Sequence, residues 1–141
     1  MSVKENQRSR LSRRLLTEAM LDLMDEHGTT RISVTALCER AELNRSTFYA
    51  HYQDVSDLLY QIERDFLDRL FQAIDPKDSF TEKGLTSFFE RVRRESRGFL
   101  TLLRMDPHFR QRLLDSTAAL YLRAREPEAR RNDLLQDPVM M

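Results

Sequence analysis

Few residues in this chain can interrupt a helix, since its 141 residues include only three glycines and four prolines. The chain must therefore consist of a few long elements. Leu11, Leu15, Ala19 and Leu23 recur at intervals of four, the spacing that places side chains on one face of a helix. No run of alternating β-branched residues is present, so the sequence does not predict strands. We therefore predict an all-α fold.

Helical periodicity and capping residues divide the chain into seven predicted helices. Gly28 is an expected C-cap, and Ser33, Asn44 and Ser56 are expected N-caps. The apolar pattern fails after Glu126-Pro127, which predicts a tail. The predicted helices span about 9–27, 34–41, 45–51 and 57–73, with a fifth through 85–92, a sixth over 99–104 after an interruption at 96–98, and a seventh from 107.

Side chains outside the first three helices are expected to be mainly structural. The aromatic residues on helical stripes should be mostly core, and the arginines around residue 94 should form a solvated face. These aromatic residues are Phe66, Phe71, Phe88, Phe89, Phe99, Phe109 and Tyr121, and the arginines are Arg91, Arg93, Arg94 and Arg97.

Positive charge is concentrated near the N-terminus, although the formal net charge of the chain is zero. A neutral chain is not expected to bind nucleic acid through bulk charge. In residues 1–14, however, five basic residues accompany a single acidic one. A basic arm can follow DNA phosphates or enter a minor groove, and a solubilising terminus is the alternative. The candidate residues of this arm are Arg8, Arg10, Arg13 and Arg14.

Several classes of protein are not expected. No stretch approaches the roughly 20 apolar residues that span a bilayer, and no secretory signal is present, so we expect a cytoplasmic protein without a membrane partner. Cys38 is the single cysteine, and we expect it to be a buried packing residue. No phosphate-binding glycine loop, metal-ligand spacing or nucleophile motif is found, so we expect no enzyme, cofactor or metal.

Residues 31–52 predict a helix-turn-helix, because two short helices are joined there by a three-residue turn. Such a pair needs a small residue where the helices cross, and Cys38 occupies that position. The outward face of the second helix must be polar to enter a major groove. The apolar anchors are Leu37, Ala41, Leu43 and Phe48, and the outward residues are Arg45, Ser46, Thr47 and Tyr49.

These segments resemble the TetR family of transcriptional regulators. Residues 32–41 are similar to its second helix, and the string Asn44-Arg45-Ser46-Thr47-Phe48-Tyr49 is similar to its recognition helix in the branch that includes activators of dihydroxyacetone kinase operons. The likeness is strong over about residues 9–70. It implies a DNA-binding domain at 1–55 and a helical regulatory and dimerisation domain of about four helices at 56–141.

The resemblance also implies roles for particular residues. Ser33 and Thr35 would contact phosphate or a base edge. Arg45, Ser46 and Thr47 would face the groove, and Asn44 would be a further DNA-binding residue. Tyr49 and His51 would reach phosphates. The implied partners are double-stranded DNA, a second copy of the chain, and a small-molecule or protein effector whose binding residues the sequence does not identify.

Three departures from the family leave other interpretations open. Glu42 replaces the usual glycine of the turn, and Gln53 and Val55 replace lysines that flank the fourth helix. Family members continue after the seventh helix with two further helices that form the dimer interface. Compared with them, the chain is expected to be short at the C-terminus. The leading hypothesis is a DNA-binding transcriptional regulator. The alternatives are a coregulator that acts through a partner protein or heterodimer, and a small-molecule carrier or sensor built on the last four helices.

Overall fold

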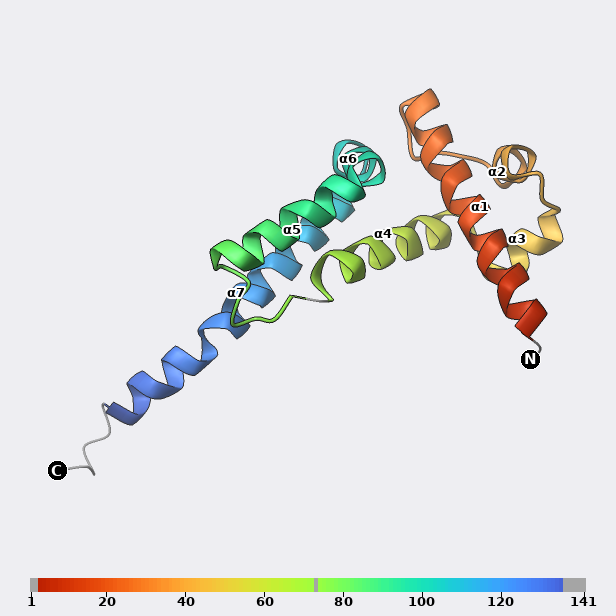
Figure 1. Cartoon of the computed structure of the whole chain (residues 1–141). Coiled ribbons are helices and arrows are strands. Elements are labelled where there is room, and N and C mark those ends of the chain that lie inside the picture. The colour runs from red at the N-terminus through yellow and green to blue at the C-terminus, as the bar shows by residue number, and fades with distance from the viewer. Residues whose placement is uncertain (1–2, 73, 136–141) are drawn as a thin grey trace.

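The computed structural model describes the backbone of residues 3–72 and 74–135 and the side chains of residues 6–72 and 74–125. These ranges contain seven helices and no strand, so the predicted all-α fold is confirmed (Figure 1). The helices are α1 (Val3–His27), α2 (Val34–Ala41), α3 (Arg45–His51), α4 (Val55–Phe71), α5 (Glu82–Arg94), α6 (Ser96–Met105) and α7 (Pro107–Leu135).

The helices form two groups that α4 connects. α1, α2 and α3 cluster at one end of the molecule, and α4 leads from them to α5, α6 and α7 (Figure 1). One cluster of buried apolar side chains runs through both groups, from Met20 and Phe48 to Phe99 and Phe109. α4 and α6 approach closely at Gly98, where a Cβ would lie 2.4 Å from Cζ of Phe66. Any larger residue at this position would require the buried Phe66 ring to shift.

Local capping explains why the sequence predicts the first helices well. Gly28 has a φ of 63° and donates its N–H to the Met24 carbonyl at 2.8 Å, which ends α1. Ser33 Oγ accepts the Ala36 N–H at 3.0 Å, as expected of the N-cap of α2. Asn44 occupies the N-cap position of α3, but its side chain makes no capping hydrogen bond.

Two predicted boundaries are wrong. α1 begins at Val3 rather than Ser9, so the basic residues from Arg8 onward lie on a helix and not on an extended arm. α7 continues through Pro127 to Leu135, where a tail was expected. Its last part projects from the molecule in Figure 1, and a helix without a core to cover needs no apolar stripe. The rest of the predicted tail, 136–141, lies outside the described residues.

Two further boundaries differ by a few residues. α4 is capped by Asp54, whose Oδ1 accepts the Asp57 N–H at 2.7 Å, and not by Ser56. The helix begins here because a second, reciprocal bond supports the cap at Asp54: Asp57 Oδ2 accepts the Gln53 N–H at 2.9 Å. α5 and α6 are separated only by Glu95, so the predicted interruption at 96–98 lies inside α6.

The expected core aromatic residues are only partly confirmed. Phe66, Phe99 and Phe109 are buried, whereas Phe89 is 64% and Tyr121 is 43% exposed. Phe89 is exposed because it lies on α5 beyond the face that packs on α4, where Phe88 contacts Phe71 at a ring-centroid distance of 5.8 Å. Helical spacing identifies an apolar stripe but not its edge.

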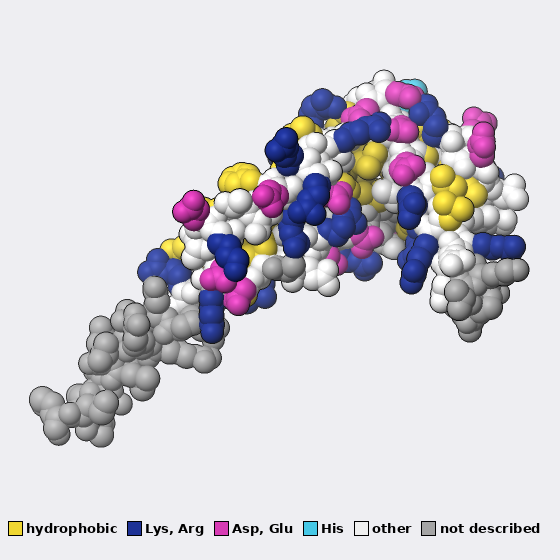
Figure 2. Space-filling model, in the orientation of Figure 1, with side chains coloured by type: hydrophobic (Ala, Val, Ile, Leu, Met, Phe, Trp, Pro, Cys, Tyr) yellow, Lys and Arg dark blue, Asp and Glu magenta, His cyan; other side chains and the backbone are white. Residues whose placement is uncertain are grey.

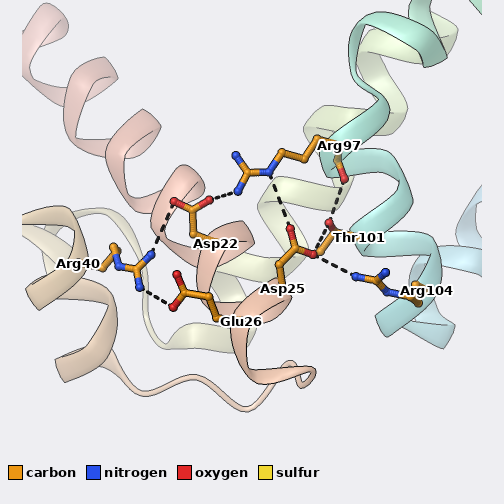
Figure 3. Close-up of polar contacts among 7 residues, drawn as sticks. All are labelled: Asp22, Asp25, Glu26, Arg40, Arg97, Thr101 and Arg104. Carbon is orange, nitrogen blue, oxygen red and sulfur yellow. Dashed lines mark hydrogen bonds and ion pairs between the residues drawn. The ribbon is translucent and has the colours of Figure 1, made fainter.

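A polar network joins α1 to α2 on one side and to α6 on the other (Figure 3). Arg40 of α2 pairs with Glu26 at 2.5 Å, and Arg97 of α6 pairs with Asp22. Arg97 is therefore not simply part of a solvated face, since it links helices that are far apart in sequence. The remaining contacts join Asp22 to Arg40, and Asp25 to Arg97, Thr101 and Arg104.

Candidate nucleic-acid interface

The candidate interface is built on the crossing of α2 and α3. Phe48 of α3 is fully buried, and Leu37, Cys38 and Ala41 form the buried face of α2. Burial raises the pKa of the Cys38 thiol, and the nearby Arg45 guanidinium offsets this only in part. Cys38 is thus the small packing residue that the sequence predicts, with its thiol kept neutral.

The turn between α2 and α3 depends on a left-handed residue. Glu42 has φ 55° and ψ 44°, and its N–H faces the carbonyls of Cys38 and Glu39. The following residue, Leu43, donates its N–H to the Cys38 carbonyl at 3.0 Å. Glycine adopts this conformation freely, whereas a side chain there costs about 1 kcal/mol. The backbone therefore has the shape expected of the family's glycine, with an exposed carboxylate added.

The outward side of α3 is polar. Tyr49 is 51% exposed and packs edge-on against buried Phe48, with ring centroids 5.2 Å apart. This contact with a buried ring favours one orientation of the Tyr49 side chain. The other candidate residues on α3 are Asn44, Arg45 and Ser46, which are exposed, and Thr47 and His51, which are half-buried.

α2 contributes two exposed hydroxyls beside α3. Thr35 Oγ1 accepts a hydrogen bond from Arg45 Nη1 at 3.2 Å. The Ser33 hydroxyl oxygen is already used in capping α2, but its O–H remains a donor. Seven of the eight predicted DNA-binding residues around α2 and α3, those from Ser33 to Tyr49, therefore lie at the starts of these two helices or on the outer surface that the helices share.

The basic residues of α1 lie beside the opposite end of α3. Arg10, Arg13 and Arg14 line an open groove of about 560 Å³ between α1 and α4, together with Tyr52 and Arg64. The lining is of mixed charge, with five arginines and the three carboxylates of Glu18, Asp65 and Glu95. Arg64 is not among the residues predicted from the sequence, because a charge on a predicted helix carries no signal of what it faces. Arg8 is exposed on α1 and does not line this groove.

Arg13 and His51 are close enough to interact electrostatically. Burial lowers the pKa of His51 from its ordinary value, and the Arg13 guanidinium lowers it further. Burial also raises the pKa of Tyr52, while Arg13 acts against that shift. The basic part of α1 therefore lies close to the C-terminal end of α3.

The start of α4 is less suited to phosphate than the start of α3. The N–H of Gln53 and the side chain of Gln61 donate to the Asp57 carboxylate, which holds its pKa below the ordinary value. Asp54 accepts a further N–H at this helix start. Two carboxylates therefore take the donors that a phosphate would need.

The surface carries mixed charge. Figure 2 shows Lys and Arg side chains interspersed with Asp and Glu over the visible face, without one continuous basic surface. Within the described ranges, no group of three His, Cys, Asp or Glu residues is placed to hold a metal ion. In the same ranges, no helix is both long and apolar enough to cross a membrane.

Comparison of this chain with known protein families, with curated proteins and with solved structures finds no match. The likeness to the TetR family therefore rests on the residues quoted above.

Proposed function

We propose that this chain is a DNA-binding transcriptional regulator in which α2 and α3 form a helix-turn-helix and α3 enters the major groove. One observation carries the proposal: α3 buries Phe48 and presents Arg45, Ser46 and Tyr49 outward beside Thr35. Arg45 is suited to grip a guanine with two hydrogen bonds, worth roughly 1–3 kcal/mol of discrimination. Ser46 and Thr47 supply hydroxyls for a base or a phosphate.

The groove between α1 and α4, where arginines outnumber carboxylates by five to three, supports the proposal at the flank of α3. Arginines of α1 and α4 meet there beside His51 and Tyr52. Contacts to phosphate position a protein on DNA without reading its sequence. We therefore assign Arg10, Arg13 and Arg14 to phosphate contacts, and the start of α4 to a minor role.

We further propose that the chain binds DNA as a homodimer and that an effector acts on α4–α7. Two recognition helices in a dimer would be about 34–36 Å apart, or a multiple of that distance. The network of Asp22, Asp25 and Arg97 links α1 to α6 and offers a route by which a change in the second group of helices reaches the first.

The deciding experiment is selection of bound sequences from a random DNA pool, with measurement of the solution mass of the same preparation. A palindromic consensus and the mass of a dimer are expected. Arg45→Ala should lower affinity for the consensus and relax specificity at one base pair, and Tyr49→Phe should weaken binding across all sequences. Enrichment of no sequence, or full affinity and specificity in both variants, would reject the proposal.

A coregulator that acts through a partner protein is the second candidate. Large apolar side chains are exposed on α5–α7, namely Phe89 (64%), Leu100 (60%), Leu114 (63%) and Leu122 (68%). Such residues are typical of protein contacts when they are contiguous. This candidate requires that the purified chain shows no salt-sensitive, sequence-dependent binding to its own promoter DNA, and tight binding there excludes it.

A further inference from the structure

One edge of α5 exposes apolar side chains to solvent. Phe89 is 64% and Leu85 is 41% exposed, and their spacing of four places them next to each other on the helix. The Phe89 ring packs edge-on against the half-buried ring of Phe88, with centroids 5.8 Å apart. Figure 1 shows α5 on the outside of the second group of helices, and Figure 2 shows hydrophobic side chains at the surface above it.

Opposite charges flank this apolar pair. Glu82 lies three positions before Leu85, Arg93 lies four positions after Phe89, and both charged residues are exposed. Neither side chain forms a hydrogen bond or an ion pair with any residue that the structure describes. The two are about 16 Å apart along the helix, too far to pair with each other. The edge of α5 therefore carries, in chain order, an acid, two apolar residues and a base.

This order is complementary to itself when a second copy of α5 runs antiparallel to the first. A two-fold axis beside Ser87 passes midway between Leu85 and Phe89, and within half a residue of the midpoint of Glu82 and Arg93. Each apolar residue then faces the other one across the axis, and each charge lies beside its opposite. A parallel pair would instead place like charges together, which is unfavourable.

The overall charge of the chain does not oppose such a contact. Its formal net charge is zero, so two copies do not repel each other at long range. An aromatic residue at the centre with charges at the rim is the usual composition of an interface. Because one helix of 13 residues from each copy makes a small contact, the association should be weak and should depend on concentration.

We propose that this edge of α5, formed by Glu82, Leu85, Phe89 and Arg93, binds a second copy of the chain with the two α5 helices antiparallel. The inference rests on the homodimer of the proposed function and gives that homodimer a surface. Its test uses no DNA, so this interface can fail while DNA binding by α3 stands.

Sedimentation equilibrium of the full chain, from about 1 μM to about 1 mM, tests the interface. The apparent mass should rise from that of one chain to that of two. Phe89→Glu should raise the dissociation constant roughly ten-fold or more, because it places a carboxylate at the centre of the contact. Leu122→Glu on α7, where the leucine is 68% exposed, is the matched control and should dimerise like wild type. If circular dichroism shows that Phe89→Glu does not fold, Phe89→Ser replaces it.

Charge reversal tests the antiparallel arrangement. Glu82→Arg and Arg93→Glu should each dimerise about ten-fold more weakly, because like charges then face each other. An equimolar mixture of the two variants should form a heterodimer with nearly the wild-type affinity, since every arginine at these positions then meets a glutamate. A loss of stability within each chain could not be repaired by mixing, so this readout is specific to contact between copies.

Three results would overturn the proposal. A wild-type chain that stays monomeric throughout the concentration range removes both this interface and the proposed homodimer. A dimer that Phe89→Glu leaves intact keeps the homodimer and removes only this interface. A mixture of the two charge variants that associates no better than either variant alone excludes the antiparallel pairing.

Discussion

Arg45 of α3 donates a hydrogen bond to the hydroxyl of Thr35 on α2, with Nη1 and Oγ1 3.2 Å apart. The contact joins the first turns of two helices that a three-residue turn separates. It restricts the conformers of a long, exposed side chain before any ligand arrives. A guanidinium that is already oriented loses less conformational entropy on binding.

Thr35→Val should therefore weaken binding to the selected DNA, although valine has nearly the shape of threonine. Loss of one hydrogen bond predicts a change of about 1 kcal/mol, equal to roughly five-fold in affinity. Fluorescence anisotropy with labelled duplex measures the change. Thr117→Val on α7, where the hydroxyl donates to the Leu113 carbonyl, is the control. Equal affinities of wild type and Thr35→Val would show that Arg45 needs no such support.

Substitutions at Phe48 and at Tyr49 should affect different properties. The first should lower the stability of the fold, and the second should lower DNA affinity. Phe48→Ala empties a fully buried site and should lower the free energy of unfolding by about 3–5 kcal/mol. Tyr49→Ala removes a half-exposed ring and one aromatic contact, with a loss of no more than about 1 kcal/mol. Urea denaturation measures both. Tyr49→Ala should nevertheless lose DNA affinity, and a variant that binds normally would contradict its assignment.

Glu42→Gly should stabilise the chain by about 1 kcal/mol, because glycine adopts the left-handed conformation of the turn without strain. DNA binding should also become tighter, since an exposed carboxylate leaves the proposed interface. The control is Glu39→Gly, which places glycine within α2 and should destabilise by about 1 kcal/mol. Thermal unfolding distinguishes the two, and a destabilised Glu42→Gly would be incompatible with strain at this position.

The lowered pKa of His51 should make the stability of the fold depend on pH. Its pKa is lower in the folded chain than its ordinary value of 6.5, so the unfolded chain binds more protons between the two values. The contribution of His51 to the free energy of unfolding is therefore complete above about pH 6.5, and it is lost as the pH falls through the folded pKa. His51→Gln should flatten this part of the profile, measured by urea denaturation from about pH 8 to pH 5. His27→Gln, at the exposed end of α1, is the matched variant, and an equal effect of both would exclude His51 as the cause.

Asp25→Ala should loosen the contact between α1 and α6. It removes a hydrogen bond from Thr101 at 2.8 Å and ion pairs to Arg97 and Arg104. The expected loss is about 1–2 kcal/mol, and the part due to ion pairs should shrink in high salt. The control is Asp68→Ala on the exposed side of α4, which measures how much the higher helix propensity of alanine alone changes the stability. No difference between the two variants at low salt would mean that the network is energetically neutral.

The sequence predicts well what local chemistry determines. Ser33 and Gly28 mark helix ends through bonds to residues three or four positions away, and Phe48 is apolar within an otherwise polar helix. The start of α1 could not be predicted by periodicity, because residues 3–8 lack an apolar stripe.

Contacts between distant segments could not be predicted in the same way. Arg97 and Asp22 are 75 positions apart, so only the packing of α6 on α1 brings them together. Glu63 shares its face of α4 with Leu59 and Ile62, yet charged residues are rarely buried, and its position becomes clear only when α7 supplies Arg112. The motif residues on α2 and α3 lie in one short stretch, so their closeness in space follows from the local helix geometry, and their role in DNA binding stays a prediction.

α4 would have a mechanical consequence for the proposed DNA-bound dimer. Its 17 residues form a rod of roughly 25 Å that packs against α1, α5 and α7. Arg112 of α7 contacts the middle of the rod at Glu63, and Phe88 of α5 contacts its end at Phe71. A tilt of only about 5° in a rod of that length moves its far end by about 2 Å. Hydrogen bonds to base edges hold over a range of roughly 0.5 Å. In the proposed dimer, a small tilt of α4 against α6, at the contact of Phe66 with Gly98, would therefore move the two recognition helices out of register with their half-sites.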